Sequence, residues 1–241
     1  MLQTILHQLM PNRCLWCDLP VHQAGQQVCS CCQQALPGFD IVFYQGNLLW
    51  LPAVQQGLPK LHAERLVSLS WYQPPYDYAI SQWKLQQQLA AGHWLLQQFR
   101  LLAQQYQAAG FPLPDCICYI PMPPWRYLKR GFNQARLLAE VLAKTWQIPM
   151  LPLLQRQRSG QHQRLLKRSQ RQHNSRQLFQ LNAVFRMQLK QLGQIALVDD
   201  VITTGSTLQQ ACRCLQQGGA KPVQLWTLAI TAKDRRQGSL P

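Results

Sequence analysis

The sequence predicts an α/β protein in which helices flank a parallel sheet, with a small four-cysteine module at the N-terminus. In the second half of the chain, short apolar runs alternate with helical patterns, as in strand-helix-strand units. Two close pairs of cysteines lie near the start. The 241 residues suffice for one main α/β core and a small appendage, since single cores stop growing at about 250 to 300 residues.

The composition is that of a folded and strongly basic protein. Hydrophobic residues make up 47% of the chain, and 24 Lys and Arg face 9 Asp and Glu, which gives a net charge of +15. Such a surplus attracts polyanions, so nucleic acid, a phosphorylated metabolite or an anionic membrane surface are the expected partners. No run reaches the roughly 18 apolar residues of a membrane span, and the first residues lack a secretory signal, so we expect a cytoplasmic protein without a transmembrane segment.

Five of the nine cysteines crowd into the stretch that runs from CLWC to CSCC. The spacing of Cys14 and Cys17, and of Cys29 and Cys32, suits two edges of a tetrahedral thiolate site, which favours Zn2+ over iron. Four thiolates leave no open position, so the metal is expected to be structural. Cys31 is a spare thiol that leaves the register of the second pair open. The remaining cysteines lie in apolar runs and are expected in the core: Cys116, Cys118, Cys212 and Cys214.

Between the cysteines and residue 110, the patterns predict one strand and one or two helices. RLVSLSWY, at residues 65–72, alternates like a strand, and residues 76–106 carry apolar side chains at helical spacing. Lys84 lies on the polar side of that helical pattern, where a lysine is usually a solvated residue. The chain divides into a zinc module at 1–40, a helical linking region at 41–110 and a sheet domain at 111–235.

The C-terminal half contributes the remaining strands and helices. A buried strand at Cys116–Ile120 stops at Pro121, because proline cannot donate to a strand ladder. Gly131 marks a turn, and a helix begins near Asn133. QIALV, at residues 194–198, has the length and branching of a buried parallel strand. A helix from Ser206 that ends at Gly218 and Gly219 leads into the next strand, at 221–230.

The segment VITTGSTLQQ joins a predicted strand to a helix and has the chemistry of an anion site. At a helix N-terminus, unpaired backbone N–H groups and the helix dipole converge on negative charge. A glycine lets the backbone approach the ligand, and hydroxyls donate to phosphate oxygens. The segment offers Thr203, Thr204, Gly205, Ser206 and Thr207. Neither the Walker motif nor the dinucleotide glycine motif is present, which favours a phosphate monoester.

Asp199 and Asp200 come directly before this segment, at the carboxyl end of a predicted strand, where α/β sheets bind ligands. Adjacent carboxylates repel each other, so at least one is expected to bond a diol or a metal-bound partner. A ribose 2′,3′-diol beside a 5′-phosphate satisfies both halves of the motif. The alternatives are that Asp200 is a helix-proximal cap and that the hydroxyl cluster is an ordinary N-cap, and each explains only part of the string.

VDDVITTGST resembles the 5-phosphoribosyl-1-pyrophosphate (PRPP) motif of type I phosphoribosyltransferases, in which the acids hold the ribose and the loop holds the 5′-phosphate. The four-cysteine pattern, IPMPPWRYLKRGFNQA, and the spacing of Gln163, Arg171, Asn174 and Phe179 resemble the ComF family over about residues 14 to 230. RGFNQA is the most discriminating fragment. Ser206 is a small departure, since family members usually have Ala there.

The resemblance implies a type I phosphoribosyltransferase-like sheet behind a zinc module, and a role in natural competence, DNA uptake and the use of extracellular DNA. It places zinc on Cys14, Cys17, Cys29 and Cys32, and PRPP with Mg2+ on Asp199, Asp200 and Thr203 to Thr207. Candidates for contact with pyrophosphate or DNA are Lys84, Arg130, Arg156, Arg158, Arg164, Lys167, Arg168 and Arg171.

Three functions are compatible with these residues. The basic arm at 155–176 holds seven cations and no acid, and with Trp125, Tyr127, Lys129, Arg130 and Phe132 it has the composition of a single-strand channel. Binding of single-stranded DNA together with PRPP is therefore the favoured function. The alternative is a transferase that passes ribose 5-phosphate from PRPP to a base-like acceptor. The third is an adaptor, peripheral to the inner membrane, that docks on a DNA-translocating helicase or membrane channel.

Overall fold

The computed structural model describes residues 12–157, except 22, 24 and 60, and residues 178–231, except 222. Three short elements come before the first strand: α2 (Ser30–Gln34), η1 (Leu48–Trp50) and α3 (Pro52–Gly57). The sheet consists of β1 (Arg65–Trp71), β2 (Cys116–Tyr119), β5 (Ile195–Val198), β6 (Val201–Ile202) and β7 (Val223–Ile230). The longer connecting helices are α4 (Tyr76–Leu85), α5 (Leu89–Ala108), α6 (Pro124–Arg130), α7 (Gln134–Trp146) and α10 (Ser206–Gln217).

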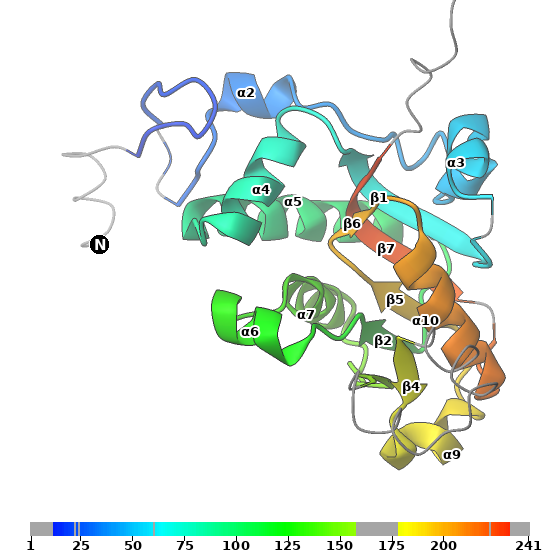
Figure 1. The fold of residues 1–241 in the computed structure, drawn as a ribbon. Helices are drawn as coiled ribbons and strands as arrows, with labels where there is room; N and C mark the ends of the chain where they lie inside the picture. The colour runs from blue at the N-terminus through cyan, green and yellow to red at the C-terminus, as the bar shows by residue number, and fades with distance from the viewer. Residues whose placement is uncertain are drawn as a thin grey trace, which may run out of the picture.

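The main sheet is parallel, and its strands lie in the order β1-β7-β5-β2 (Figure 1). Both β5 and β6 pair with β7, so they form successive parts of one line through the sheet. Every residue of β5 and β7 is buried, as expected for strands that are covered on both faces. Because all the strands run the same way, their carboxyl ends lie along one edge of the sheet.

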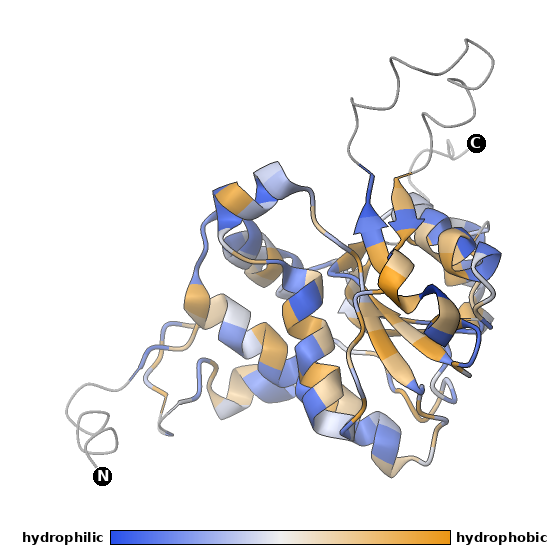
Figure 2. Ribbon diagram, turned by 90° about the horizontal axis from the view of Figure 1, so that it is seen from below, coloured by the Kyte–Doolittle hydropathy of each residue, from blue (hydrophilic) through white to orange (hydrophobic). Residues whose placement is uncertain are grey.

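Helices cover both faces of this sheet (Figure 2). On one face α5 and α7 pack together, and Trp226 of β7 meets the rings of Tyr106 and Trp146, each at a centroid distance of 4.9 Å. On the other face α10 buries Leu208 and Leu215. Among the described residues, no helix combines the length and the apolar character that crossing a membrane would require.

The N-terminal cysteine module packs onto α5. The ring of Trp16 lies edge-on to that of Trp94, with 5.1 Å between their centroids. Gln33 and Gln98 exchange two amide hydrogen bonds of 2.8 and 3.1 Å between α2 and α5. Cys14 is buried in the same apolar cluster as Trp94. The module is therefore joined to the helical layer by apolar packing and by a paired amide contact.

Four short elements precede β5 and lie outside the main sheet among the described residues. β3 (Leu154–Arg156) and β4 (Phe179–Leu181) form a two-stranded antiparallel ribbon, which is followed by η2 (Ala183–Phe185) and α9 (Arg186–Leu189). The sequence pattern did not predict this ribbon, because its partners lie on either side of a polar stretch without periodicity. Of the predicted basic arm, only Gln155, Arg156 and Gln157 are within the described residues.

The strongly patterned elements occur where they were predicted. Gly131 adopts a left-handed φ of 77°, and Asn133 caps α7 by accepting a 3.1 Å hydrogen bond from the N–H of Ala135. The helical pattern at 76–106 forms two helices, α4 and α5. The expected α/β fold, with a parallel sheet flanked by helices, is confirmed. The sheet contains strands from both the predicted linking region, 41–110, and the predicted sheet domain, 111–235, because β1 of the former pairs with β7 of the latter.

Candidate anion site and candidate metal centre

The acid pair lies at the carboxyl edge of the sheet, between β5 and β6. The N–H of Asp199 donates to the carbonyl of Trp226 at 3.0 Å, and the carbonyl of Asp200 accepts from the N–H of Leu228 at 3.0 Å. The hydroxyl of Thr227 also donates to that carbonyl, at 2.8 Å. The backbone of both acids is thus fixed by β7, and their side chains stand where a parallel sheet binds ligands.

Lys84 meets the second acid of the pair. Its Nζ lies 2.6 Å from Oδ2 of Asp200, and the two side chains retain 31% and 15% of their exposure. Asp200 Oδ1 accepts from the N–H of Val201, and Asp199 Oδ1 accepts from the N–H of Asp200, both at 2.9 Å. The lysine that the sequence placed on a polar helix face is therefore part of the acid site.

The two carboxyl groups differ in their electrostatic surroundings. Burial, and then the charge of Asp200, raise the pKa of Asp199 well above its ordinary value, although the N–H of Asp200 and the ammonium of Lys84 act in the opposite direction. Burial thus disfavours the charged form of Asp199, whereas Asp200 forms an ion pair with Lys84. This arrangement resolves the repulsion between the adjacent acids without a bound ligand, since Lys84 supplies the opposite charge.

The hydroxyl-rich loop follows β6 and leads into α10. Gly205 takes a left-handed φ of 70° immediately before the helix, a conformation that glycine adopts readily. Thr204 Oγ1 donates to Ser206 Oγ at 3.1 Å, and Thr231 Oγ1 donates to the carbonyl of Thr203 at 3.1 Å. The N-cap residue Gly205 has no side chain that could cap α10, and only the N–H of Ser206 donates to a loop hydroxyl, that of Thr204 at 3.5 Å, so the next N–H groups of the first turn have no described side-chain partner and could bind an anion.

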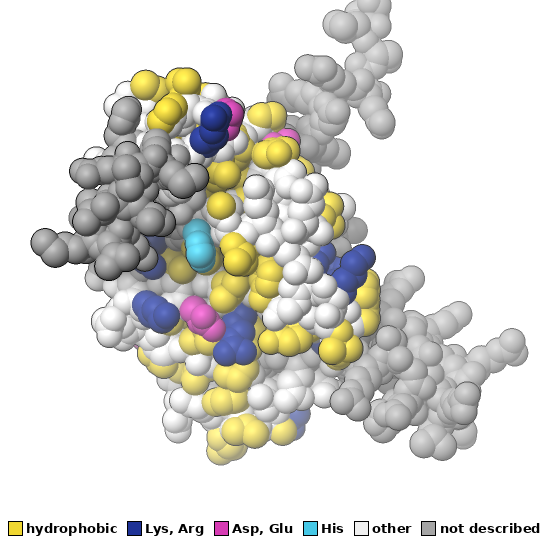
Figure 3. Space-filling model, turned by 90° about the vertical axis from the view of Figure 1, so that its left-hand side faces the viewer, with side chains coloured by type: hydrophobic (Ala, Val, Ile, Leu, Met, Phe, Trp, Pro, Cys, Tyr) yellow, Lys and Arg dark blue, Asp and Glu magenta, His cyan; other side chains and the backbone are white. Residues whose placement is uncertain are grey.

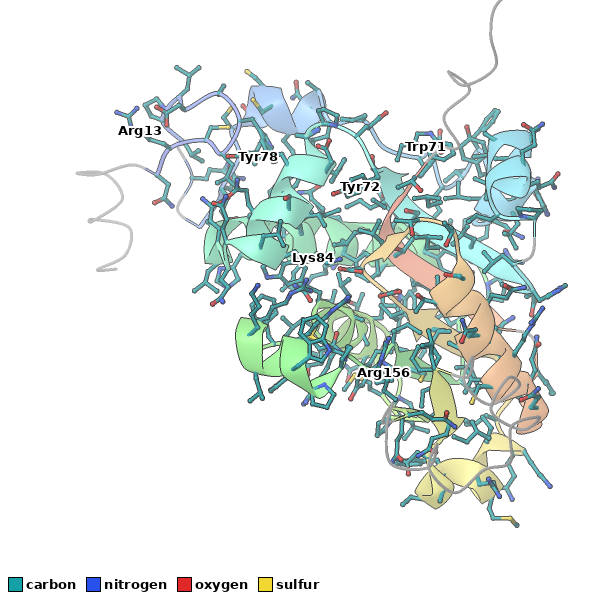
Figure 4. All side chains as sticks on the ribbon, viewed as in Figure 1. Arg13, Trp71, Tyr72, Tyr78, Lys84 and Arg156 are labelled. Carbon is teal, nitrogen blue, oxygen red and sulfur yellow. The ribbon has the colours of Figure 1, made fainter. Side chains whose placement is uncertain are left out.

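Two arginines approach the acid pair from other elements. Arg130, at the end of α6, is half-buried, and burial lowers its pKa while the charge of Asp200 raises it. Arg156, on β3, is also half-buried, and its pKa is lowered by burial and by Arg126 but raised by Asp199. Figure 4 shows Lys84 on the α4 side of the sheet edge and Arg156 on the ribbon side. Of these three predicted cations, Lys84 contacts the acid pair, whereas Arg130 and Arg156 interact with it through charge, without a hydrogen bond or ion pair to it among the described residues.

The remaining predicted cations cannot be placed. Arg158, Arg164, Lys167, Arg168 and Arg171 all lie outside the described residues.

The aromatic residues predicted for a nucleic-acid surface divide into two groups. On α6, the side chains of Trp125 and Tyr127 are exposed, and the guanidinium of Arg126 lies 5.0 Å from the ring centroid of Trp125. Phe132 instead stacks on the buried Trp83 at 5.7 Å and belongs with the core, which removes it from the expected exposed set. On the face that Figure 3 shows, Lys and Arg side chains lie among exposed hydrophobic ones.

The four cysteines of the predicted metal centre come together. The Sγ atoms of Cys14, Cys17, Cys29 and Cys32 all lie within 4.8 Å of one another, and those of Cys17 and Cys29 are 3.7 Å apart. A zinc ion with Zn–S bonds of about 2.3 Å needs sulfur atoms separated by about 3.8 Å, so the thiols fit a metal such as zinc with small adjustments. Bound there, the metal would tie the loop of Cys14 to α2.

The structure resolves which cysteine completes the cluster. Cys29 is the N-cap of α2 and accepts from the N–H of Cys32, which turns Cys32 inward and leaves Cys31 exposed. Burial alone would raise the pKa of Cys14, but backbone N–H groups of Cys29, Cys17 and Trp16 lower it to about 6. A thiol held partly as thiolate is the state that binds a metal ion.

The other cysteines behave as the apolar runs predicted. Cys116, Cys118 and Cys212 are buried, and burial raises the pKa of each thiol to about 12. Cys214 is half-buried, and its pKa is also raised by burial. These thiols are therefore unreactive members of the core around β2 and α10.

The fold and these two sites define an α/β protein with a hydroxyl-rich loop at the sheet edge and a four-thiol module. Competence protein F of Haemophilus influenzae is 31% identical over 222 residues, which cover 90% of this chain and 96% of that protein. DNA utilization protein YhgH of Salmonella typhi is 32% identical over 239 residues, which cover 92% of this chain and 98% of that protein. The chain belongs to the ComF family.

More limited likenesses lie beyond these two relatives. Competence protein ComFC of Bacillus subtilis is 34% identical over 110 residues, which cover 45% of this chain and 42% of that protein. No family model matches the chain. A glutamine PRPP amidotransferase structure from B. subtilis, with ADP and GMP, aligns at a TM-score of 0.39 and 20% identity over 55% of this chain and 25% of that one. A likeness of that size carries no argument about fold or ligand.

Proposed function

We propose that this protein acts in the uptake and use of extracellular DNA, and that it binds PRPP and single-stranded DNA. The observation that carries the proposal is the acid pair at the sheet edge, directly followed by a hydroxyl loop and an uncapped helix N-terminus. The names of the relatives, Competence protein F and DNA utilization protein YhgH, support the process. The geometry supports the ligand.

PRPP would extend along the loop. Its 5′-phosphate would accept from the N–H groups and hydroxyls of Thr203 to Thr207, at the positive end of α10. The ribose diol would bond Asp199 and Asp200, whose carboxyl oxygens would accept from its hydroxyls. Lys84 would then leave Asp200 and turn toward the pyrophosphate, where Arg130 and Arg156 supply further positive charge.

Magnesium would enter with PRPP rather than occupy a site of its own. Asp200 already uses one oxygen for Lys84 and the other for the N–H of Val201. Mg2+ prefers octahedral oxygen ligands and is usually held by one or two carboxylates together with substrate phosphates. The pyrophosphate of PRPP offers those phosphate oxygens, so PRPP affinity is expected to depend on Mg2+.

Calorimetry with PRPP tests the ligand. The wild-type protein is expected to bind PRPP in Mg2+, and Asp200→Asn is expected to weaken binding at least tenfold, because it removes a charged acceptor of the diol. Glu140→Gln is the matched control, since Glu140 is an acid on α7 that pairs with Arg136. Equal affinity in the wild type and Asp200→Asn would exclude this site for PRPP.

Fluorescence anisotropy with a labelled single-stranded oligonucleotide tests the DNA partner. The affinity is expected to fall steeply with salt, because Lys and Arg side chains displace counterions from phosphates. Reversing the charges of Arg164, Lys167 and Arg168 is expected to weaken binding and flatten the salt slope. Binding that is absent, or that does not respond to salt, would remove DNA as a direct partner.

A transferase is the second candidate, and it is favoured by the three cations around the acids. In that reaction a nitrogen of the acceptor base forms a bond to C1′ of PRPP while the bond from C1′ to the pyrophosphate oxygen breaks. Lys84, Arg130 and Arg156 would stabilise the departing pyrophosphate. Release of pyrophosphate with one of a panel of bases, lost in Asp200→Asn, would establish turnover. PRPP binding without release would leave PRPP as a bound effector.

A cellular assay separates both candidates from an adaptor role. The double variant Asp199→Asn/Asp200→Asn is expected to reduce transformation or growth on DNA. An adaptor that works only by docking on a helicase or membrane channel predicts an unchanged phenotype at normal protein abundance.

A further inference from the structure

An open apolar pocket of about 410 Å³ lies between the end of β2 and α6. Tyr119 contributes to its wall from β2, and Tyr127 and Leu128 contribute from α6. Tyr127 is 48% exposed and Leu128 is 85% exposed, although both are large apolar side chains. A pocket of this size falls in the range of about 300 to 1,000 Å³ that is typical for small-molecule sites. The site described above makes no use of it.

The wall of this pocket suits a flat ring with a polar edge. Aromatic, proline, methionine and leucine side chains make up most of it, and they offer stacking and dispersion contacts. Asn133 is its one amide, and only 8% of that residue is exposed. Asn133 donates to the carbonyl of Ile120 and accepts from the N–H of Ala135. An amide has two N–H groups and two lone pairs, so these described partners leave one of each for a ligand.

The surroundings of the pocket are positively charged. Helix α6 carries Arg126, Lys129 and Arg130 and no acid. Nη1 of Arg156 lies 3.5 Å from the carbonyl of Pro121, a residue of the pocket wall. Arg156 therefore lies beside the pocket. The occupant that complements this arrangement combines a flat, partly polar ring with negative charge.

We propose that the pocket holds one unpaired nucleobase, stacked on Tyr127, while its flanking phosphates contact the cations of α6. The inference rests on the proposed function and adds to it a binding site for one base of a strand or of a free nucleotide. It does not involve residues 158–177. A nucleic-acid double helix is excluded from the pocket because its bases are stacked and paired, so the proposal predicts a preference for single strands.

The first test compares Tyr127→Ala with two controls on a 12-nucleotide oligothymidylate. Loss of the ring is expected to weaken binding about tenfold, in line with the usual effect of removing one stacking partner. Tyr127→Phe keeps the ring and is expected to bind the oligomer with the affinity of the wild type. Phe43→Ala is the second control. It removes an aromatic side chain that is 75% exposed and that comes before η1 in the sequence, far from the pocket beside β2. This variant is expected to bind the oligomer as the wild type does.

An abasic oligomer of the same length separates base contacts from phosphate contacts. Wild-type protein is expected to bind it more weakly than oligothymidylate, and Tyr127→Ala is expected to bind both equally. Lys129→Gln should instead lower the salt slope by about 0.7 on both oligomers, as expected for one phosphate contact to a single strand. A wild type that binds the two oligomers equally would overturn the base pocket while leaving charge-driven DNA binding intact.

Cross-linking locates the base and distinguishes the two sources of it. An oligomer with one 5-iodouracil is expected to photocross-link to Tyr127 or Tyr119, as identified by mass spectrometry, and thymidine monophosphate is expected to compete if free nucleotides are also ligands. Failure to compete would assign the pocket to strands alone. Cross-links that map only to other parts of the chain would overturn the pocket. If no oligomer binds at all, the proposed DNA function itself fails, whatever the behaviour of Tyr127.

Discussion

The ammonium of Lys84 on α4 lies 2.6 Å from a carboxylate oxygen of Asp200 at the end of β5, across 116 positions of the sequence. Both side chains are mostly withdrawn from water, at 31% and 15% exposure. This pair ties the helix that follows β1 to the ligand edge of the sheet. It also occupies the acid that we propose for the ribose diol, so binding of PRPP requires that Lys84 moves.

Breaking this pair is expected to cost stability. Lys84→Met and Asp200→Asn should each lower the free energy of unfolding by about 1 to 2 kcal/mol, between the values for exposed and buried pairs. The double variant should lose less than the sum, because neither partner is then left alone. Urea denaturation of the four proteins measures this coupling. The exposed pair of Arg136 and Glu140, 3.0 Å apart on α7, is the control and should couple by only about 0.3 to 0.5 kcal/mol. Strict additivity at Lys84 and Asp200 would contradict the contact.

Asp199 makes stability depend on pH with a defined sign. Burial and the charge of Asp200 raise the pKa of Asp199 well above the value of 3.8 expected for an unfolded chain. The native state therefore binds a proton that the unfolded state releases, so this contribution is complete below about pH 3.8 and is lost as pH rises through the folded pKa. Asp199→Asn cannot ionise and keeps an acceptor for the N–H of Asp200.

The Asn variant should thus be more stable than the wild type at about pH 8, and the difference should shrink toward about pH 4. Urea midpoints of the wild type and Asp199→Asn at the two pH values measure the effect. A wild type that gains stability over Asp199→Asn as pH rises would show that Asp199 ionises readily in the folded protein.

The parts of the site that depend on local signals were predictable, and those that depend on long-range packing were not. The loop of Thr203 to Thr207 follows from a buried strand, a glycine and a helix start within one short segment. Lys84 was predicted on the polar side of a helix and as a candidate for pyrophosphate or DNA, but not as the partner of Asp200, because periodicity describes a helix and not what lies opposite its polar side. Asp200 is its partner only because the fold brings α4 beside the end of β5.

Two elements were missed for physical reasons that the structure makes clear. Helix α6 begins with Pro124 directly after Pro123, and proline is favourable at the first helical position because its missing N–H would be unpaired there. Between the predicted end of the strand at Pro121 and the turn at Gly131 there is thus a helix that carries the exposed Trp125 and Tyr127. Strands β3 and β4 have only three residues each, and their pairing spans residues 157–178, so neither has a pattern of its own.

The cysteine cluster predicts that Cys32 is needed for zinc binding and that its neighbour Cys31 is not. Cys32 lies within 4.8 Å of the other three cluster sulfurs, whereas Cys31 is outside the cluster and exposed. Purified protein should contain about one zinc per chain by mass spectrometry of metals, Cys32→Ser should lose it, and Cys31→Ser should keep it. Because Cys14 packs with Trp94, zinc loss should also lower the melting temperature. Equal zinc loss in both variants would indicate a different ligand set.

Two features disfavour a side chain at Gly205, namely its left-handed backbone and the lack of space for a Cβ. Gly110 shares only the first of them. Gly205 and Gly110 both have a left-handed φ, of 70° and 73°. Alanine should therefore cost each about 1 to 2 kcal/mol of stability through backbone strain. At Gly205 the added Cβ would also lie 3.1 Å from Cδ2 of Leu58, whereas at Gly110 it would meet nothing within 4 Å.

Gly205→Ala should accordingly unfold at lower urea than Gly110→Ala, and it alone should lose PRPP affinity, because it shifts the N–H groups that we propose for the 5′-phosphate.

Thr204→Val provides an independent check. It removes the hydroxyl that donates to Ser206 Oγ at 3.1 Å and accepts from the N–H of Ser206 at 3.5 Å, and it adds no left-handed strain to the loop. We expect Thr204→Val to weaken PRPP binding about tenfold by calorimetry with little change in urea midpoint, since Thr204 is exposed. Should both Gly205→Ala and Thr204→Val bind PRPP as the wild type does, the phosphate must lie elsewhere on the sheet edge, and the acid pair would need a different ligand.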